Sequence, residues 1–413
     1  MNESTAQDRL SRPASTVERI EILDALRGFC LLGILLGNIT HWSGWDFMRL
    51  EARASLAGLD TMATFQFMQH AGVEGKFYTI FSLLFGVGIT LHLQRHPRDA
   101  ERLLVRRMVI LALFGALHMS LLFPGDILLP YAMVGLALIP IARLRSRALI
   151  SLGVAALLAP VLGQAFVILW DIDLGKPLRD VGAKILIGLA SEPLRGIDWV
   201  DFLRRLDGWN YLAWSLSGPA YRFALLLVTW RFFKLLGVMC IGIWIGREIL
   251  KGCLDHPRNL ARVLVYGAAF GVPGSVIYAS GGGLWSARVW EGWFTHVWYA
   301  VSVVPLGLAY AAAFALLWQT RARALLRCFS FAGRLSLTNY VLQSLVCVFL
   351  FYGVGFGAAG SFGPLGLVVV AIAVFVCQAL VSSWWLRFAR LGPVEWLWRA
   401  AIHGKRPRFL RAG

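Results

Sequence analysis

Long apolar runs, separated by short polar or basic segments, dominate the chain. Several of these runs reach about 20 residues with few charges, the length that an α-helix needs to cross a hydrocarbon core of roughly 30 Å. A transmembrane barrel would instead require short strands that alternate between apolar and polar residues. The pattern therefore predicts an all-α, polytopic helical membrane protein.

The apolar runs predict about ten transmembrane helices. We expect them near residues 22–39, 74–93, 108–123, 126–142, 148–170, 232–249, 260–279, 294–318, 335–355 and 364–386. Residues 41–70 mix polar and aromatic side chains and predict an amphipathic helix at the membrane interface. Residues 171–221 predict a long polar region on the outer side.

The pattern shows one domain with two tails. We expect a disordered cytoplasmic tail at 1–19, a single transmembrane domain at 20–399 and a basic cytoplasmic tail at 400–413. The N-terminal segment does not resemble a signal peptide, because the apolar run that follows it is too long and lacks a small-residue cleavage site.

Composition and charge agree with a membrane protein. Of 413 residues, 58% are hydrophobic and 15% are charged, and the formal net charge is +17. The basic residues collect in short segments between apolar runs and near both ends, which places those segments and both termini in the cytoplasm. Their excess therefore indicates topology and contact with anionic lipid rather than nucleic-acid binding. The six cysteines form no CxxC pair, so we predict no disulfide and no metal site.

Polar residues within or beside the spans fall into two layers. Charged side chains are costly in lipid, so they are expected to face the protein interior and to mark a functional site. A histidine beside a carboxylate is suited to general base catalysis. The outer layer comprises Asn38, His41, Glu74, Lys76, His118 and Asp126. The inner layer comprises Asp24, Arg27, Arg334, Ser336, Asn339 and Gln343.

Each candidate also has a structural interpretation. Asp126 follows Pro-Gly and suits a helix N-cap, and His118 suits a hydrogen-bonded interior position. Asn339 and Gln343 suit hydrogen bonds between helices. Asp24 and Arg27 suit an ion pair near the headgroups, whereas the spacing of Glu395 and Arg399 predicts a surface salt bridge of little energetic value.

Several segments together resemble the YeiB-like family of bacterial membrane proteins, known as domain of unknown function 418. They are LDALRGFCLLGILLGNI, EGKFYTIFSLLFGVG, ALHMSLLFPGDILLPYAMVG, GRLSLTNYVLQS, FYGVGFG and WLRFARLGPVEWLWR. The family in turn is similar to the transmembrane acyltransferase superfamily, which has an RG motif in its first span. That likeness implies a bacterial inner-membrane protein that moves an acyl group from cytoplasmic acyl-CoA to an envelope or small-molecule acceptor at the outer face.

The resemblance suggests roles for the two layers. Arg27 and Arg334 would bind the anionic part of acyl-CoA, with Asn339, Gln343 and Lys76 as further binding residues. His118 or His41, assisted by Glu74 or Asp126, would be the base, and Asn38 would stabilise the oxyanion. The alternatives are a transporter or exporter of a small polar solute, since polar helix faces also suit a pathway, and a non-catalytic membrane partner or sensor. The oligomeric state stays open.

Overall fold

The computed structural model describes residues 21–95, 98–191, 194, 196–281, 289–404 and 407–410. The predicted tail at 1–19 lies outside this range. The elements in chain order are α2 (Glu21–Trp42), η2 (Trp45–Phe47), α3 (Leu50–Ala57), α4 (Leu59–Met68), η3 (Gln69–Val73), α5 (Lys76–Arg95), α6 (Ala100–Leu121), α7 (Leu128–Ile141), α8 (Ser146–Leu169), α9 (Lys176–Leu189), α10 (Trp199–Arg204), α11 (Gly208–Val228), α12 (Arg231–Leu250), η4 (Cys253–Asp255), α13 (Pro257–Ser280), α14 (Val289–Trp318), α15 (Arg323–Arg334), α16 (Ser336–Phe351), α17 (Pro364–Phe388) and α18 (Pro393–His403).

The helices confirm the all-α class and a multi-pass membrane protein. Among the described residues, 7 helical segments are long and apolar enough to cross a membrane, and two bent pairs, α11 with α12 and α15 with α16, bring the number to 9. Every predicted span coincides with a helix. The tenth predicted span coincides with α7, which has only 14 residues and is about 21 Å long. This is shorter than the hydrocarbon core, so the count of ten spans stays a prediction.

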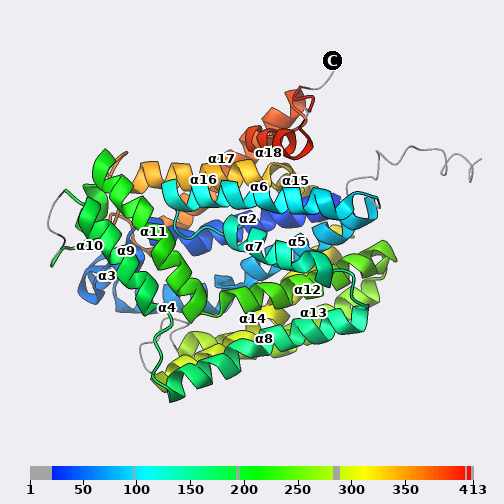
Figure 1. Ribbon diagram of the computed structural model, residues 1–413, viewed down its shortest axis with the longest axis horizontal. Coiled ribbons are helices and arrows are strands. Elements are labelled where there is room, and N and C mark those ends of the chain that lie inside the picture. Colours follow the sequence, from blue (N-terminus) through cyan, green and yellow to red (C-terminus); the bar gives the residue numbers. More distant parts are fainter. Residues whose placement is uncertain are drawn as a thin grey trace, which may run out of the picture.

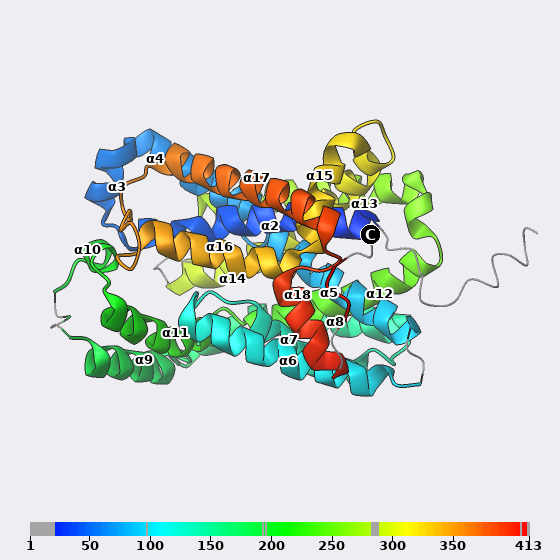
Figure 2. The same ribbon diagram turned by 90° about the horizontal axis from the view of Figure 1, so that it is seen from above.

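Helix α2 lies at the centre of the bundle. It contacts α5, α14, α15, α16 and α17, and Figures 1 and 2 show these helices around it. Glycines allow the closest approach, to α15. A Cβ on Gly28 would lie 2.0 Å from the carbonyl oxygen of Phe329, and one on Gly333 would lie 1.8 Å from that of Asp24.

The two ends of the bundle differ. Short helices α3, α9 and α10 gather at one end, and the start of α2 lies with α15 at the other (Figures 1 and 2). We call these the far end and the near end. In the topology predicted from the sequence, the far end is the outer side and the near end is the cytoplasmic side.

Three segments differ from their predicted form. Residues 171–221 are largely helical, because they contain α9, α10 and most of α11. Residues 41–70 form η2, α3 and α4 rather than one interfacial helix. The predicted tail boundary at 399 falls within α18, which extends to His403. In all three segments polar residues interrupt the apolar pattern, but they do not prevent the backbone hydrogen bonds of a helix.

The prediction of a surface salt bridge for Glu395 is wrong. It is buried, and its Oε1 accepts hydrogen bonds from the backbone N–H groups of Leu337, at 2.8 Å, and Thr338, at 3.0 Å. The first N–H groups of a helix have no partner within it, so this carboxylate stabilises the start of α16 and attaches α18 to it.

Candidate active site

A group of partly exposed polar side chains lies at the far end, and we call it the outer polar cluster. It consists of His41, Asp46, His70, Glu74, Arg222 and Arg231, contributed by α2, η2, η3, the η3–α5 turn, α11 and α12. The side chains of the four acid and histidine members are between 20% and 48% exposed. Electrostatic interactions connect Asp46 with His70 and Glu74, and Glu74 with Arg231. The cluster is therefore one site rather than scattered surface charges.

The closest pair in the cluster is His70 and Glu74. The Nδ1 atom of His70 lies 2.6 Å from Oε2 of Glu74. With Nδ1 protonated and donating to the carboxylate, Nε2 is the ring atom that accepts a proton. This is the geometry of a general base whose ring is oriented by a carboxylate.

The backbone around this pair is unusual and explains its geometry. His70 lies in η3, a π-helical turn, and such turns occur often at functional sites. Gly75 then adopts a φ of 78°, and a Cβ there would lie 2.6 Å from the hydroxyl of Tyr299. Lys76 is fully buried, and its Nζ donates to the carbonyl oxygen of His70 at 2.6 Å. The glycine and the lysine together hold the turn that carries the pair.

His41 is a second histidine of the cluster, with a side chain that is 33% exposed but a buried Nε2 atom. Its Nδ1 lies 4.0 Å from Oδ2 of Asp46, which also accepts a hydrogen bond from Thr40 at 3.3 Å. Its Nε2 has no hydrogen-bond partner within the described part of the chain. Burial raises the pKa of the Asp46 carboxyl, while the hydrogen bond from Thr40 and the positive charge of Arg53 oppose that rise. His41 is therefore near a carboxylate but less tightly oriented than His70.

His118 and Asp126 do form a pair, but with a buried third member. Nδ1 of His118 lies 2.9 Å from Oδ1 of Asp126, and Nε2 lies 2.9 Å from Oγ of Ser344. All three residues are buried. We call them the buried triad. Its connectivity is that of a Ser-His-Asp catalytic triad, yet no part of it is open to a substrate, and its contacts hold α6, α7 and α16 together.

Asp126 combines this contact with the predicted cap. Its Oδ2 accepts from the backbone N–H of Leu129 at 2.8 Å, at the start of α7. Its carbonyl oxygen accepts from Arg222 at 3.0 Å, which connects the buried triad to the outer polar cluster. The structure thus keeps Asp126 fully engaged in helix-to-helix contacts.

Other predicted residues take different places. Asn38 is half-buried on α2, near η3, because Gln69 donates to the carbonyl oxygen of Leu36 at 2.9 Å. Gln343 donates to Gln378 on α17 at 3.1 Å, and Asn339 donates to Ser382 on α17 at 2.9 Å. The structural interpretation of these two amides, as contacts between helices, therefore agrees with their geometry.

At the near end, Arg27 belongs to a group of arginines. It forms an ion pair of 2.8 Å with the buried Asp24. Together with Arg95 and Arg399 it interacts electrostatically with Arg107, whose guanidinium lies 4.8 Å from the ring centroid of Trp398. We call Arg27, Arg95, Arg107 and Arg399 the inner arginine cluster. Arg334 lies at the end of α15, which packs against α2.

Sequence reasoning missed His70, Arg222, Arg231 and Ser344. The i, i+4 spacing of His70 and Glu74 was a usable local signal, because such residues share a helix face. Arg231 and Lys234, at i and i+3 beside an apolar run, were another. Ser344 gave no signal, since its partner is 226 positions away in the chain.

Comparison with known proteins identifies the family. The family described as "Protein of unknown function (DUF418)" matches residues 245–405. The chain is 30% identical over 400 residues to the uncharacterized protein YeiB of Escherichia coli (strain K12), with coverage of 93% of this chain and 96% of that protein. This chain belongs to the YeiB-like DUF418 family. Another relative is the uncharacterized protein YxaH of Bacillus subtilis (strain 168), 29% identical over 417 residues, with coverage of 95% of this chain and 96% of that protein.

Membership of the DUF418 family confirms the resemblance drawn from the sequence motifs. The matched relatives extend over nearly the whole chain, so the outer polar cluster, the buried triad and the inner arginine cluster all lie within the shared region.

Proposed function

We propose that this protein is an acyltransferase of the bacterial inner membrane. It would move an acyl group from cytoplasmic acyl-CoA to a hydroxyl or amine acceptor at the outer face. The observation that carries the proposal is the His70–Glu74 pair, with 2.6 Å between Nδ1 and Oε2 and side chains 20% and 23% exposed. The pair is oriented for proton transfer, and both of its side chains are partly exposed.

The chemistry assigns one role to each member of the pair. Nε2 of His70 removes the proton from the acceptor as the acceptor oxygen or nitrogen attacks the thioester carbonyl carbon. The carbon–sulfur bond then breaks, the imidazolium returns its proton to the leaving thiolate, and Glu74 stabilises the imidazolium between these two steps. Asn38, on α2, would donate a hydrogen bond to the oxyanion. His41 is the second candidate for the base.

The near end supports a role in holding the donor. The inner arginine cluster gathers guanidinium groups that suit the phosphates of CoA, and Arg27 begins the helix that leads to Asn38. These two residues are about three helical turns apart, or roughly 16 Å. A pantetheine arm is long and thin enough to extend over that distance. Acyl-CoA is thus the proposed donor, membrane lipids are the surroundings, and no metal is required for these steps.

The test is acyl transfer by the purified full-length protein in detergent. Release of CoA from acetyl-CoA and from longer acyl-CoA is followed with and without an acceptor extract. We expect His70→Gln to lower kcat by about 100-fold to 10,000-fold, the usual contribution of a general base, and Glu74→Gln to lower it by about 100-fold. His403→Gln, at the end of α18, is the matched control and should retain wild-type turnover.

Two results would overturn this proposal. The first is a wild-type protein that neither transfers nor hydrolyses any of these acyl groups. The second is a folded His70→Gln variant with wild-type kcat. Full activity in His70→Gln together with its loss in His41→Gln would transfer the role of base to His41 and reject the assignment made here.

A transporter is the second candidate, and one observation favours it. The pair α11 and α12 bends by 69°, and α15 and α16 bend by 80°, and broken helices often form solute sites in transporters. Flux of a polar solute into liposomes that contain the protein, without any acyl donor, would support transport. Flux that occurs only when acyl-CoA is present would instead favour acyl transfer.

A further inference from the structure

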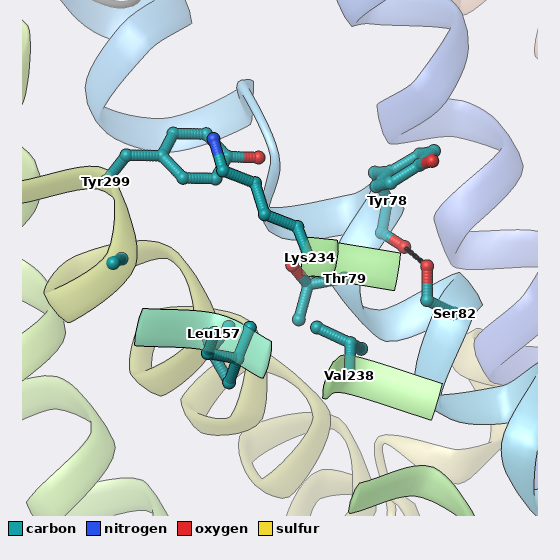
Figure 3. A pocket seen from close by; sticks show the side chains of 9 residues that line it. Tyr78, Thr79, Ser82, Leu157, Lys234, Val238 and Tyr299 are labelled. Atoms are coloured by element: carbon teal, nitrogen blue, oxygen red, sulfur yellow. Dashed lines mark hydrogen bonds between the residues drawn. The ribbon is translucent and has the colours of Figure 1, made fainter. Parts of the chain in front are cut away.

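Lys234 is a buried cation for which the protein supplies little compensation. It is only 5% exposed, and its Nζ has no hydrogen-bond partner among the residues that the structure describes. The Nζ lies 3.8 Å from the ring centroid of Tyr299, and Figure 3 shows the lysine extending across the cavity to that ring. An ammonium group can form three hydrogen bonds, so the aromatic face satisfies only part of its requirement.

Nearby charges make the deficit larger. Arg231 precedes Lys234 by one helical turn, and its NH1 donates to the hydroxyl of the same tyrosine at 2.9 Å. Glu74 is the acidic neighbour that interacts with Arg231, with Lys234 and with Lys76. That carboxylate is already hydrogen-bonded by His70 and by Tyr278. One negative charge thus serves three cations, and uncompensated buried charge is strongly unfavourable.

Lys234 lines a small cavity whose wall is mostly apolar. The lining includes Tyr78, Thr79 and Ser82 of α5, Lys234 and Val238 of α12, and Tyr299 of α14. The cavity has room for about one water molecule. An oxygen atom of a larger ligand is of the same size. The cavity can therefore receive one oxygen of a ligand whose remainder lies outside it.

We propose that Lys234, Arg231 and the ring of Tyr299 form an anion-binding site, hereafter the anion pocket, which takes one oxygen of a phosphate or carboxylate group. The oxygen occupies the cavity and accepts a hydrogen bond from Nζ of Lys234, and Arg231 balances the rest of the charge. Such charge-assisted hydrogen bonds are about twice as strong as neutral ones. The bend at Trp230, whose φ is 54°, directs the start of α12 and both of its cations toward this position.

The inference goes beyond the proposed acyl transfer, because it applies to an acyl acceptor and to a transported solute alike. Arg231 belongs to the outer polar cluster and interacts with Glu74, so the anion pocket adjoins the His70–Glu74 pair. A molecule held there by its anionic group would present its remainder to that pair. The chemistry points to an anionic ligand, either a soluble phosphate or carboxylate compound or the headgroup of an anionic lipid.

The experiment measures thermal unfolding of the full-length protein in detergent, without any acyl donor. Chloride is replaced at constant ionic strength by phosphate, methyl phosphate or acetate. We expect a saturable rise in Tm of about 3 to 5 °C with at least one of these oxyanions. Lys234→Met, which keeps most of the length of the side chain but removes its charge, should abolish the rise. Lys251→Met, at the other end of the same helix and exposed, should retain it.

A parallel measurement in nanodiscs distinguishes the source of the anion. A rise with methyl phosphate in detergent indicates a soluble ligand, and a rise only with phosphatidylglycerol, compared with phosphatidylcholine, indicates a lipid headgroup. Equal Tm values of the wild-type protein in chloride, in every oxyanion and in both lipids would overturn the proposal. So would a rise that persists in Lys234→Met or, if that variant does not fold, in Lys234→Gln. Because no acyl donor is present, failure of acyl transfer leaves this result unaffected.

Discussion

The contact between α5 and α12 rests on two glycines and allows a quantitative test of the packing. A Cβ on Gly86 would lie 2.3 Å from the carbonyl oxygen of Met239, and one on Gly242 would lie 2.4 Å from that of Leu83. Both clashes are with backbone, which cannot turn aside as a side chain can. Ordinary contacts need about 3.4 Å or more, so an alanine at either position forces the helices apart by about 1 Å.

The matched control lies on the same helix. Gly88, two residues from Gly86, has open space around its hypothetical Cβ, with nothing within 4 Å. Overpacking typically costs about 1 to 3 kcal/mol, whereas alanine in place of an unhindered helical glycine gains up to about 1 kcal/mol. We therefore expect Gly86→Ala to destabilise the protein and Gly88→Ala to be neutral or slightly stabilising.

Thermal unfolding in detergent, followed by intrinsic tryptophan fluorescence, measures the difference. With the usual unfolding entropy per residue, the cost for Gly86→Ala corresponds to a fall in Tm of about 1 to 4 °C. Gly242→Ala should match it, because it opens the same contact from the other side. Since Lys234 lies on α12, either variant should also weaken the response to oxyanions. Equal Tm values for Gly86→Ala and Gly88→Ala would refute the packing argument.

Three further predictions concern the other polar contacts. Asp126→Ala removes the partner of His118 and of the Leu129 N–H, and should lower the free energy of unfolding by about 3 to 5 kcal/mol. Ser344→Ala should lower it by about 1 to 3 kcal/mol and keep wild-type kcat in the acyl-CoA assay. A stable Ser344→Ala variant without turnover would show that the buried triad is catalytic. Glu395→Ala should cost about 1 to 2 kcal/mol in thermal unfolding through the loss of its bonds to the start of α16. Glu248→Ala, at a partly exposed ion pair with Lys251, should cost less than about 1 kcal/mol. Burial raises the pKa of the Asp46 carboxyl, so the folded state binds a proton there more tightly than the unfolded chain does. The contribution of this carboxyl to the free energy of unfolding therefore falls as pH rises from about 4 through the folded-state pKa. Asp46→Asn should remove that slope in melts between pH 4 and 7, and an unchanged slope would contradict it.

The sequence by itself determined the class of the protein and the position of its long apolar helices other than α11. A lipid-exposed segment must satisfy its own backbone hydrogen bonds and be apolar along its whole length, so each span leaves a continuous signal in the chain. The same physics predicted that α2, which carries Arg27 and Asn38, faces the protein interior. Local spacing also contained the His70–Glu74 pair, although a π-helical turn and the left-handed Gly75, rather than a regular helix, bring its two side chains together.

Only the tertiary structure decided which polar groups share a site. His118 could have served as a base, but the packing of α16 against α6 brings Ser344 to its Nε2 and closes it. Arg231 and Lys234 looked like the basic start of an apolar run, yet the bend before α12 places them against Tyr299 on α14. His118 and Ser344 lie 226 positions apart in the chain, and Arg231 and Tyr299 lie 68 positions apart. No local pattern specifies such pairs, because helix packing depends on the shapes of both surfaces and not on the hydropathy of either one.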